Sequence, residues 1–280
     1  MKKFMLLMLS LVLSPVTMAQ VQTPQPSPAT QLKQAVGLTK VEVEYSRPSK
    51  RGREIMGELV PFGEMWRTGA NKNTMITFSD DVKVGGQALA AGTYAIFSRP
   101  GAQMWEVFFY TDSENWGTPQ EWDAEKVAAT VEAPVKSSSE TMESFEIWIS
   151  DLNNNGAQIN MGWEDQYISM ALEVPTRKKA MASIEKTLSG EPKANDYYSA
   201  ASYYLQEKMD LEQAAKWIAK AVELRNDAYW YHRQHALILH ELGKNDAAIA
   251  AAKTSQELAE KAGNSSYVRM NKESIAAWTK

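Results

Sequence analysis

The stretch YSRPSKRGREIMGELVPFGEMWRTGANKNT, residues 45–74, decides how the first two-thirds of this 280-residue chain is organised. It holds four glycines and two prolines and follows no helical or strand period, whereas its flanks alternate like strands. About 30 residues without periodicity are unusual in a compact domain unless they form a functional loop or are disordered. Apolar side chains such as Ile55, Met56 and Trp66 would anchor the stretch to a core. We therefore predict an ordered loop, packed on a sheet, that holds the ligand site.

Strand-like segments surround this loop on both sides. Val41 and Val43 fall on one face of a predicted strand, and Glu42 and Glu44 fall on the other. Turn sequences rich in glycine and asparagine separate the later segments. Further strands are predicted at residues 74–78, 82–84, 93–98, 104–110, 127–132, 144–150, 158–163 and 167–174. This series is typical of an antiparallel β-sandwich, jelly-roll-like, over residues 39–174.

The composition changes at Pro175, where alanine, lysine, glutamate and leucine begin to recur at helical spacing. Glycine, asparagine and aspartate punctuate the pattern at the expected ends of helices. Helices are predicted at residues 176–188, 194–207, 211–224, 228–242, 246–262 and 265–278. The fold expected is therefore multidomain β + α, with an all-α array over residues 175–280.

The N-terminal residues read as a targeting segment followed by a tether. Residues 1–19 combine a basic start, a short apolar run and small residues before a cleavage point, as in a signal peptide. The apolar run is too short for a helix that spans a membrane. Residues 20–38 are rich in proline and glutamine and predict a solvated tether. We expect an exported protein, periplasmic or extracellular.

Composition excludes several kinds of chemistry. The chain has no cysteine, so thiol nucleophiles and thiolate metal sites are absent. All three histidines, His232, His235 and His240, fall in the helical part, so residues 39–174 contain no Ser-His-Asp arrangement. Without an acidic ligand at fitting spacing, the histidines favour packing or surface roles over metal binding. No cofactor is expected, and a net charge of −4 gives no reason to expect a nucleic-acid partner.

The helical part repeats itself at an offset of 34 residues, with small and apolar residues recurring at matching positions. The aligned pairs are Ala214 with Ala248, Ser202 with Ala236, Leu205 with Leu239, Ile218 with Ala252, and Ala221 with Ser255. This pattern resembles the tetratricopeptide repeat (TPR). The resemblance implies a concave face, lined by the first helix of each unit, that docks a protein partner. The residues expected there are Tyr203, Gln206, Trp230, Arg233 and His240.

A second set of motifs covers residues 40–174. They include Tyr45-Ser46-Arg47-Pro48, Gly52-Arg53, Val60-Pro61-Phe62-Gly63, Trp66-Arg67-Thr68-Gly69-Ala70-Asn71, Leu89-Ala90-Ala91-Gly92-Thr93-Tyr94 and Trp116-Gly117. Together they are similar to a family of exported bacterial proteins known as domain of unknown function 2911. The resemblance implies a β-sandwich and an exported location, and it carries no known activity.

The candidate ligand site combines planar, charged and aromatic side chains from the long loop and one later segment. Guanidinium, amide, hydroxyl and indole groups together suit a carboxylate, a phosphate or a sulfated sugar. The residues proposed for this site are Arg47, Arg53, Trp66, Arg67, Thr68, Asn71 and Trp116. In the alternative interpretation, Arg67 and Asn71 only satisfy carbonyls of the loop itself. Lys50 and Arg51 favour a solvated loop tip.

Three functions remain open on these residues. The first is non-catalytic binding of a small anionic or carbohydrate ligand, with the helices docking a protein. The second is hydrolysis of a glycan or ester by loop carboxylates, for which Glu64, Glu114, Glu121 and Asp123 are available. The third is a structural interaction protein without a small ligand. Whether Arg67 and Asn71 line a cavity distinguishes the first function from the third.

Overall fold

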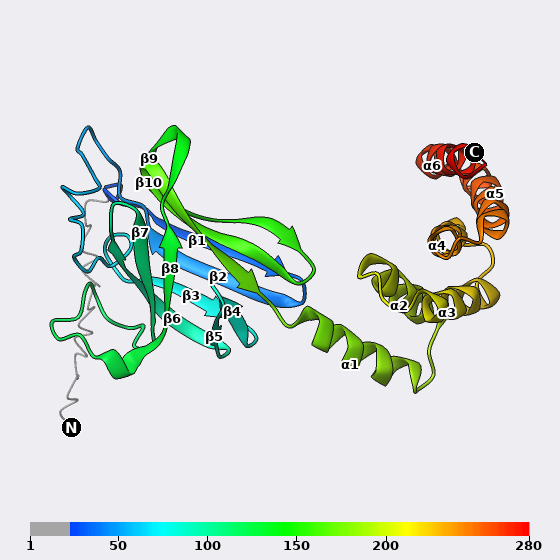
Figure 1. Ribbon diagram of the computed structural model, residues 1–280, viewed down its shortest axis with the longest axis horizontal. Coiled ribbons are helices and arrows are strands. Elements are labelled where there is room, and N and C mark those ends of the chain that lie inside the picture. The colour runs from blue at the N-terminus through cyan, green and yellow to red at the C-terminus, as the bar shows by residue number, and fades with distance from the viewer. Residues whose placement is uncertain (1–22, 280) are drawn as a thin grey trace, which may run out of the picture. The chain divides into compact units, whose positions relative to one another are not determined.

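The computed structural model describes residues 23–279 and divides into two compact units between Val174 and Pro175 (Figure 1). The first unit is built from strands and the second from helices. The expected signal peptide, residues 1–19, lies outside the described residues. Among those described, no helix combines the length and apolar character needed to cross a membrane.

The strands of the first unit form two antiparallel sheets. The six-stranded sheet has the order β1 (Ala29–Val36), β2 (Thr39–Ser46), β3 (Thr74–Phe78), β6 (Gly92–Pro100), β7 (Met104–Tyr110) and β8 (Val127–Pro134). The four-stranded sheet has the order β5 (Gln87–Leu89), β4 (Val82–Val84), β10 (Gly156–Glu173) and β9 (Lys136–Asn153). The prediction of an antiparallel β-rich unit is confirmed.

One apolar core takes side chains from both sheets. Val41 and Val43 of β2 are fully buried, whereas Glu44, the residue after Val43, is exposed. This is the alternation expected of a strand with one wet face. Ile159 of β10 belongs to the same core. The Tyr45 hydroxyl joins the sheets, because it accepts a hydrogen bond from the Ile147 amide at 3.0 Å and donates to the Ile147 carbonyl at 3.3 Å.

A smaller core lies on the other face of the six-stranded sheet, over β6 and β7. Phe97 and Tyr110 are buried there beneath Trp122, which stacks on Tyr110 with ring centroids 4.7 Å apart. The Trp122 ring therefore packs onto this face of the sheet.

The tether expected over residues 20–38 is wrong for residues 29–36, which form the edge strand β1. Its register with β2 runs from Ala29 opposite Ser46 to Val36 opposite Thr39. Leu32 packs against the core, and polar residues on the wet face find partners across the strands. These pairs are Gln31 with Glu44 at 2.9 Å and Lys33 with Glu42 at 3.1 Å. The high polar content suggested a tether, but it belongs to one face of a strand.

The described residues of the second unit, 175–279, form six helices, as predicted. They are α1 (Thr176–Leu188), α2 (Ala194–Gln206), α3 (Leu211–Leu224), α4 (Tyr229–Glu241), α5 (Asn245–Lys261) and α6 (Ser265–Trp278). Asp210 caps α3 by accepting from the Gln213 amide at 2.9 Å. Small or apolar residues such as Ala214 and Ile218 are fully buried between the helices.

Candidate functional site

The long loop between β2 and β3 is pinned to the sheets by Trp66. The Trp66 amide donates to the Ser98 carbonyl at 2.7 Å, and the Ser98 amide donates back at 2.9 Å. The half-buried Trp66 ring meets Phe145 edge-on at 5.0 Å and stacks on Trp163 at 6.1 Å. Trp66 therefore anchors the loop, as the apolar content of the sequence predicted.

The segment after Trp66 has an unusual backbone. Thr68, Gly69 and Asn71 have φ angles of 52°, 142° and 59°. A Cβ on Gly69 would lie 2.9 Å from the Thr74 hydroxyl oxygen and 3.1 Å from the Ser46 carbonyl oxygen, so no other residue fits without displacement. Thr68 is fully buried, and its hydroxyl lies 2.9 Å from that of Ser98. Thr68, a predicted ligand residue, supports the loop from inside.

A pocket of about 450 Å³ opens beside this segment. Four of the predicted ligand residues line it: Arg53, Trp66, Arg67 and Asn71. The other lining residues are Pro26, Ser27, Pro48, Ser49, Arg51, Leu59, Val60, Gly69, Ala70 and Trp163. We call this the arginine pocket, since Arg51, Arg53 and Arg67 all line it.

The three arginines of the pocket are only partly engaged. Arg53 donates to the Lys50 carbonyl at 3.0 Å and the Ser49 carbonyl at 2.7 Å. Arg67 donates through one nitrogen to the Asn71 carbonyl at 3.2 Å, and Arg51 donates to the Pro26 carbonyl at 2.8 Å.

A guanidinium has five N–H donors, so each of the three keeps donors without a partner in the described part of the chain. Ion pairs within residues 23–279 include none of the three. The pocket therefore presents guanidinium groups that form no ion pair, although the Glu143 carboxylate accepts from the Arg51 backbone amide at 2.8 Å.

The remaining predicted ligand residues lie outside the pocket lining. Arg47 donates to the Phe145 carbonyl at 3.1 Å and forms an ion pair with Glu146, so it ties the end of β2 to β9. Trp116 is 74% exposed and stands next to Gly117 in the loop after β7. A Cβ on Gly117 would lie 3.2 Å from the Arg67 guanidinium, so this loop presses directly on Arg67.

Of the two residues expected at a solvated loop tip, Arg51 is exposed in a turn as predicted, whereas Lys50 is held by the fold. Lys50 forms an ion pair with Glu164, which also accepts from the Ile55 amide at 3.3 Å and the Met56 amide at 3.4 Å. Burial alone would raise the pKa of Glu164, but these hydrogen bonds outweigh it and lower the pKa below its ordinary value. The Glu164 hydrogen bond raises the pKa of Lys50. The pair fixes the loop to β10.

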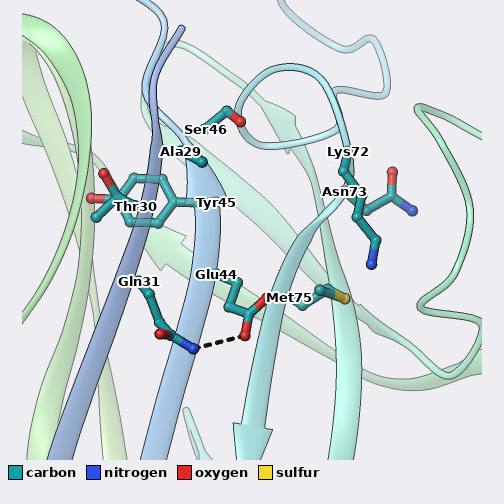
Figure 2. A pocket seen from close by; sticks show the side chains of 9 residues that line it. All are labelled: Ala29, Thr30, Gln31, Glu44, Tyr45, Ser46, Lys72, Asn73 and Met75. Atoms are coloured by element: carbon teal, nitrogen blue, oxygen red, sulfur yellow. Dashed lines mark hydrogen bonds between the residues drawn. The ribbon is translucent and has the colours of Figure 1, made fainter. Parts of the chain in front are cut away.

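A second pocket, of about 330 Å³, lies on the wet face of β1, β2 and β3 (Figure 2). Gln31 and Glu44 meet in it across adjacent strands, and Figure 2 shows the Asn73 amide turned away from that pair. Asn73 is 2% exposed, accepts from the Gly117 amide at 3.0 Å, and its Nδ2 has no partner within residues 23–279. The other lining residues are Ala29, Thr30, Tyr45, Ser46, Lys72 and Met75.

The residues proposed to bind a protein partner fall into two groups: two that contact α6, and the other three. Arg233 donates to Asn271 at 3.3 Å and Ser274 at 2.9 Å, and His240 stacks on Trp278 at 4.5 Å, so both contact α6. Trp230 is half-buried, with the Arg225 guanidinium 4.9 Å from its ring. Tyr203 is half-buried, its hydroxyl has no partner among the described residues, and Gln206 is exposed.

Carboxylates are absent from the lining of the arginine pocket. Glu64, Glu114, Glu121 and Asp123 are all exposed, and Glu114 lies 3.7 Å from Lys72. Over residues 23–279, no three histidine, aspartate or glutamate side chains gather as a metal site would require. The pocket offers cationic donors and an aromatic wall.

The fold and site define a protein with a two-sheet β-rich unit, an arginine-lined pocket and a six-helix unit. Residues 27–172 match the family model described as "Protein of unknown function (DUF2911)", and the chain belongs to this family. The family resemblance seen in the sequence is thereby confirmed. Neither a curated protein nor a solved structure matches the chain.

Proposed function

We propose that this protein is an exported, non-catalytic binding protein whose arginine pocket holds a small anionic ligand: a carboxylate, a phosphate or an acidic or sulfated sugar. One observation carries the proposal. Arg51, Arg53 and Arg67 line one hollow, keep free donors, and form no ion pair in the described part of the chain. Charge-assisted hydrogen bonds from arginine to an anion are about twice as strong as neutral ones.

The aromatic side chains support a ligand with a ring. Trp66 and Trp163 line the pocket, and the exposed Trp116 precedes Gly117, the residue that packs against Arg67. Sites for small molecules combine apolar or aromatic walls with a few placed polar groups. An acidic sugar would use the guanidinium groups and the indole faces together.

The pocket lining favours binding over hydrolysis. Glycosidases need two carboxylates that flank the scissile bond, whereas this pocket is lined by none. The histidines of the chain all lie in the helical unit, so no Ser-His pair is available within the β-rich unit. Hydrolysis by loop carboxylates remains the rival function.

For the helical unit, we propose a TPR-like array that docks a protein partner. Several residues of the 34-residue alignment are buried where neighbouring helices meet: Ala214, Ile218, Ala221, Ala236, Ala248, Ala252 and Ser255. The first helices of successive units, α2, α4 and α6, contact one another in order. A jelly-roll-like topology of the sheets and export by residues 1–19 belong to the same proposal.

A thermal-shift screen of the whole chain tests the binding function. We expect phosphate, sulfate or glucuronate to raise the melting temperature, and glucose at equal concentration to raise it less. Arg67→Ala should abolish the shift, while Lys83→Gln, which removes an exposed charge outside the pocket, should keep it. If no member of a broad anion panel shifts the wild-type protein, the proposed function is wrong.

A further inference from the structure

The residues just before β1 are held against the arginine pocket by three consecutive carbonyls. The Pro26 carbonyl accepts from Arg51 at 2.8 Å, and the Ser27 carbonyl accepts from Asn71 at 3.1 Å. The Pro28 carbonyl accepts from the Arg47 amide at 2.9 Å. We call residues 26–28 the N-terminal strap. Every strap residue is therefore tied to the loop that follows β2.

Two of the three groups that hold the strap also line the pocket. Arg51 and Asn71 face the hollow, and so do Pro26 and Ser27 of the strap itself. The strap therefore presents neutral carbonyl oxygens to donors that an anion would also use. An anion is the stronger acceptor for Arg51, because it adds the attraction of opposite charges and can accept two parallel hydrogen bonds from one guanidinium, which a single peptide carbonyl does not offer.

From this geometry we propose that the N-terminal strap is an autoinhibitory lid: it occupies pocket donors in the unbound protein and is displaced when an anion binds. The inference rests on the proposed function of the pocket. Binding of the ligand and docking of the strap then compete for Arg51 and Asn71.

The surroundings of the strap fix how far it can move. Beyond it, β1 is paired with β2 along its whole length from Ala29 onward, so release ends at Ala29. Ala29 and Thr30 line the second pocket, seen beside Ser46 and Tyr45 in Figure 2. The Ser46 hydroxyl also accepts from Asn71, at 3.2 Å. Asn71 therefore keeps one partner on β2 after the strap leaves.

The two prolines of the strap lower the conformational entropy that is lost when the strap docks. Proline restricts the unbound chain, so less conformational freedom is lost when the segment is ordered. Replacing Pro26 and Pro28 by glycine raises that loss without removing any donor or acceptor, because the three hydrogen bonds use backbone carbonyls. The double variant weakens the lid selectively.

The test is calorimetric titration of the full chain with inorganic phosphate and with glucuronate. We expect the Pro26→Gly/Pro28→Gly variant to bind at least threefold more tightly than the wild type. Pro192→Gly, the same change in the helical unit, should bind like the wild type. Equal or weaker binding by the double variant would overturn the lid while leaving the proposed function standing; no binding by either protein would refute both.

Hydrogen exchange gives an independent measurement. The Arg47 amide is protected by the Pro28 carbonyl, so it should exchange faster when saturating phosphate displaces the strap. Amides inside β2, such as that of Val43, should keep their rates. If Arg47 is equally protected with and without bound phosphate, the strap stays docked and the lid is refuted.

Discussion

Two arginines, one in each unit, show how differently this chain uses the same side chain. Arg67 lines a hollow and makes one hydrogen bond, at 3.2 Å, to a neutral carbonyl. Arg233 donates to Asn271 and Ser274 and lies 5.9 Å from the centre of the Trp278 ring. Burial lowers the pKa of Arg233. Arg233 is part of the packing of its unit, whereas Arg67 is available to a ligand.

The supports around the two arginines differ as well. Arg67 is positioned by a strained backbone turn at Thr68 and Gly69 and by the close approach of Gly117. Arg233 is positioned by a buried polar chain, in which Asn271 donates to Ser255 at 2.8 Å and Ser255 donates to the Tyr229 carbonyl at 2.7 Å. The pocket therefore depends on backbone shape, and the helical unit depends on side-chain hydrogen bonds.

The largest expected effect is at Gly69. Gly69→Ala should lower the free energy of unfolding of the β-rich unit by about 2–4 kcal/mol, since backbone strain of this kind costs about 1–3 kcal/mol and the crowded Cβ adds to it. Urea denaturation followed by tryptophan fluorescence measures it. Gly52→Ala is the matched control, because Gly52 has φ of 75° but nothing within 4 Å of an added Cβ. Equal losses at the two glycines would contradict the role of close packing at Gly69.

The next effect is at Asn271, which is fully buried. Asn271→Ala removes the donor to the Ser255 hydroxyl and one of the two acceptors of Arg233 at a fully buried site, so we expect a loss of about 1–3 kcal/mol. Thermal unfolding followed by circular dichroism measures this loss in the helical unit. Asn226→Ala, at an exposed position, should change stability by less than about 0.5 kcal/mol. A stable Asn271→Ala protein would show that the polar chain is dispensable.

Replacing Arg67 and Arg233 by alanine, one at a time, tests whether the first serves a ligand and the second serves packing. Arg233→Ala should cost about 1–2 kcal/mol, because two hydrogen bonds and ring packing are lost. Arg67→Ala should change stability by less than about 0.5 kcal/mol and affect only ligand binding. Chemical denaturation of both variants, without ligand, provides the measurement. A large loss at Arg67 would mean that its guanidinium mainly stabilises the loop.

The smallest effect is a pH dependence from the pair of Lys50 and Glu164. The pKa of Glu164 is lowered, so its contribution is present above the ordinary value of 4.5 and is lost as pH falls through the folded value. The pKa of Lys50 is raised, so its contribution is present below 10.5 and is lost at higher pH, above the folded value. The stability difference between wild type and Glu164→Gln should therefore shrink below about pH 4. A difference that stays constant from pH 7 to pH 3 would exclude the pair as its source.

The ligand loop could be predicted from sequence because its signals are local. Glycines, prolines and apolar anchors within residues 45–74 indicate an ordered, irregular segment, and Trp66, Arg67 and Asn71 fall close together in it. Their joint presence in one pocket lining follows from that proximity.

The partners that decide the role of each side chain could not be predicted, because they are distant in sequence. Arg47, a predicted ligand residue, pairs with Glu146 of β9, and Lys50, predicted at a solvated tip, pairs with Glu164 of β10. Arg51 lines the pocket and donates to the Pro26 carbonyl, a contact between distant residues that no periodic pattern in the sequence predicts. The edge strand β1 was missed because its wet face is polar and its one apolar side chain in the middle, Leu32, gives a weak pattern.

Calorimetric titration of wild-type and Arg67→Ala protein with the anion that stabilises best in the thermal screen tests the central claim most directly. The account predicts one site per chain in the wild type and at least tenfold weaker binding in Arg67→Ala, a loss of about 1.4 kcal/mol. Lys83→Gln should bind like the wild type. Saturable binding that is unchanged in Arg67→Ala would place the ligand elsewhere and contradict the arginine pocket as its site.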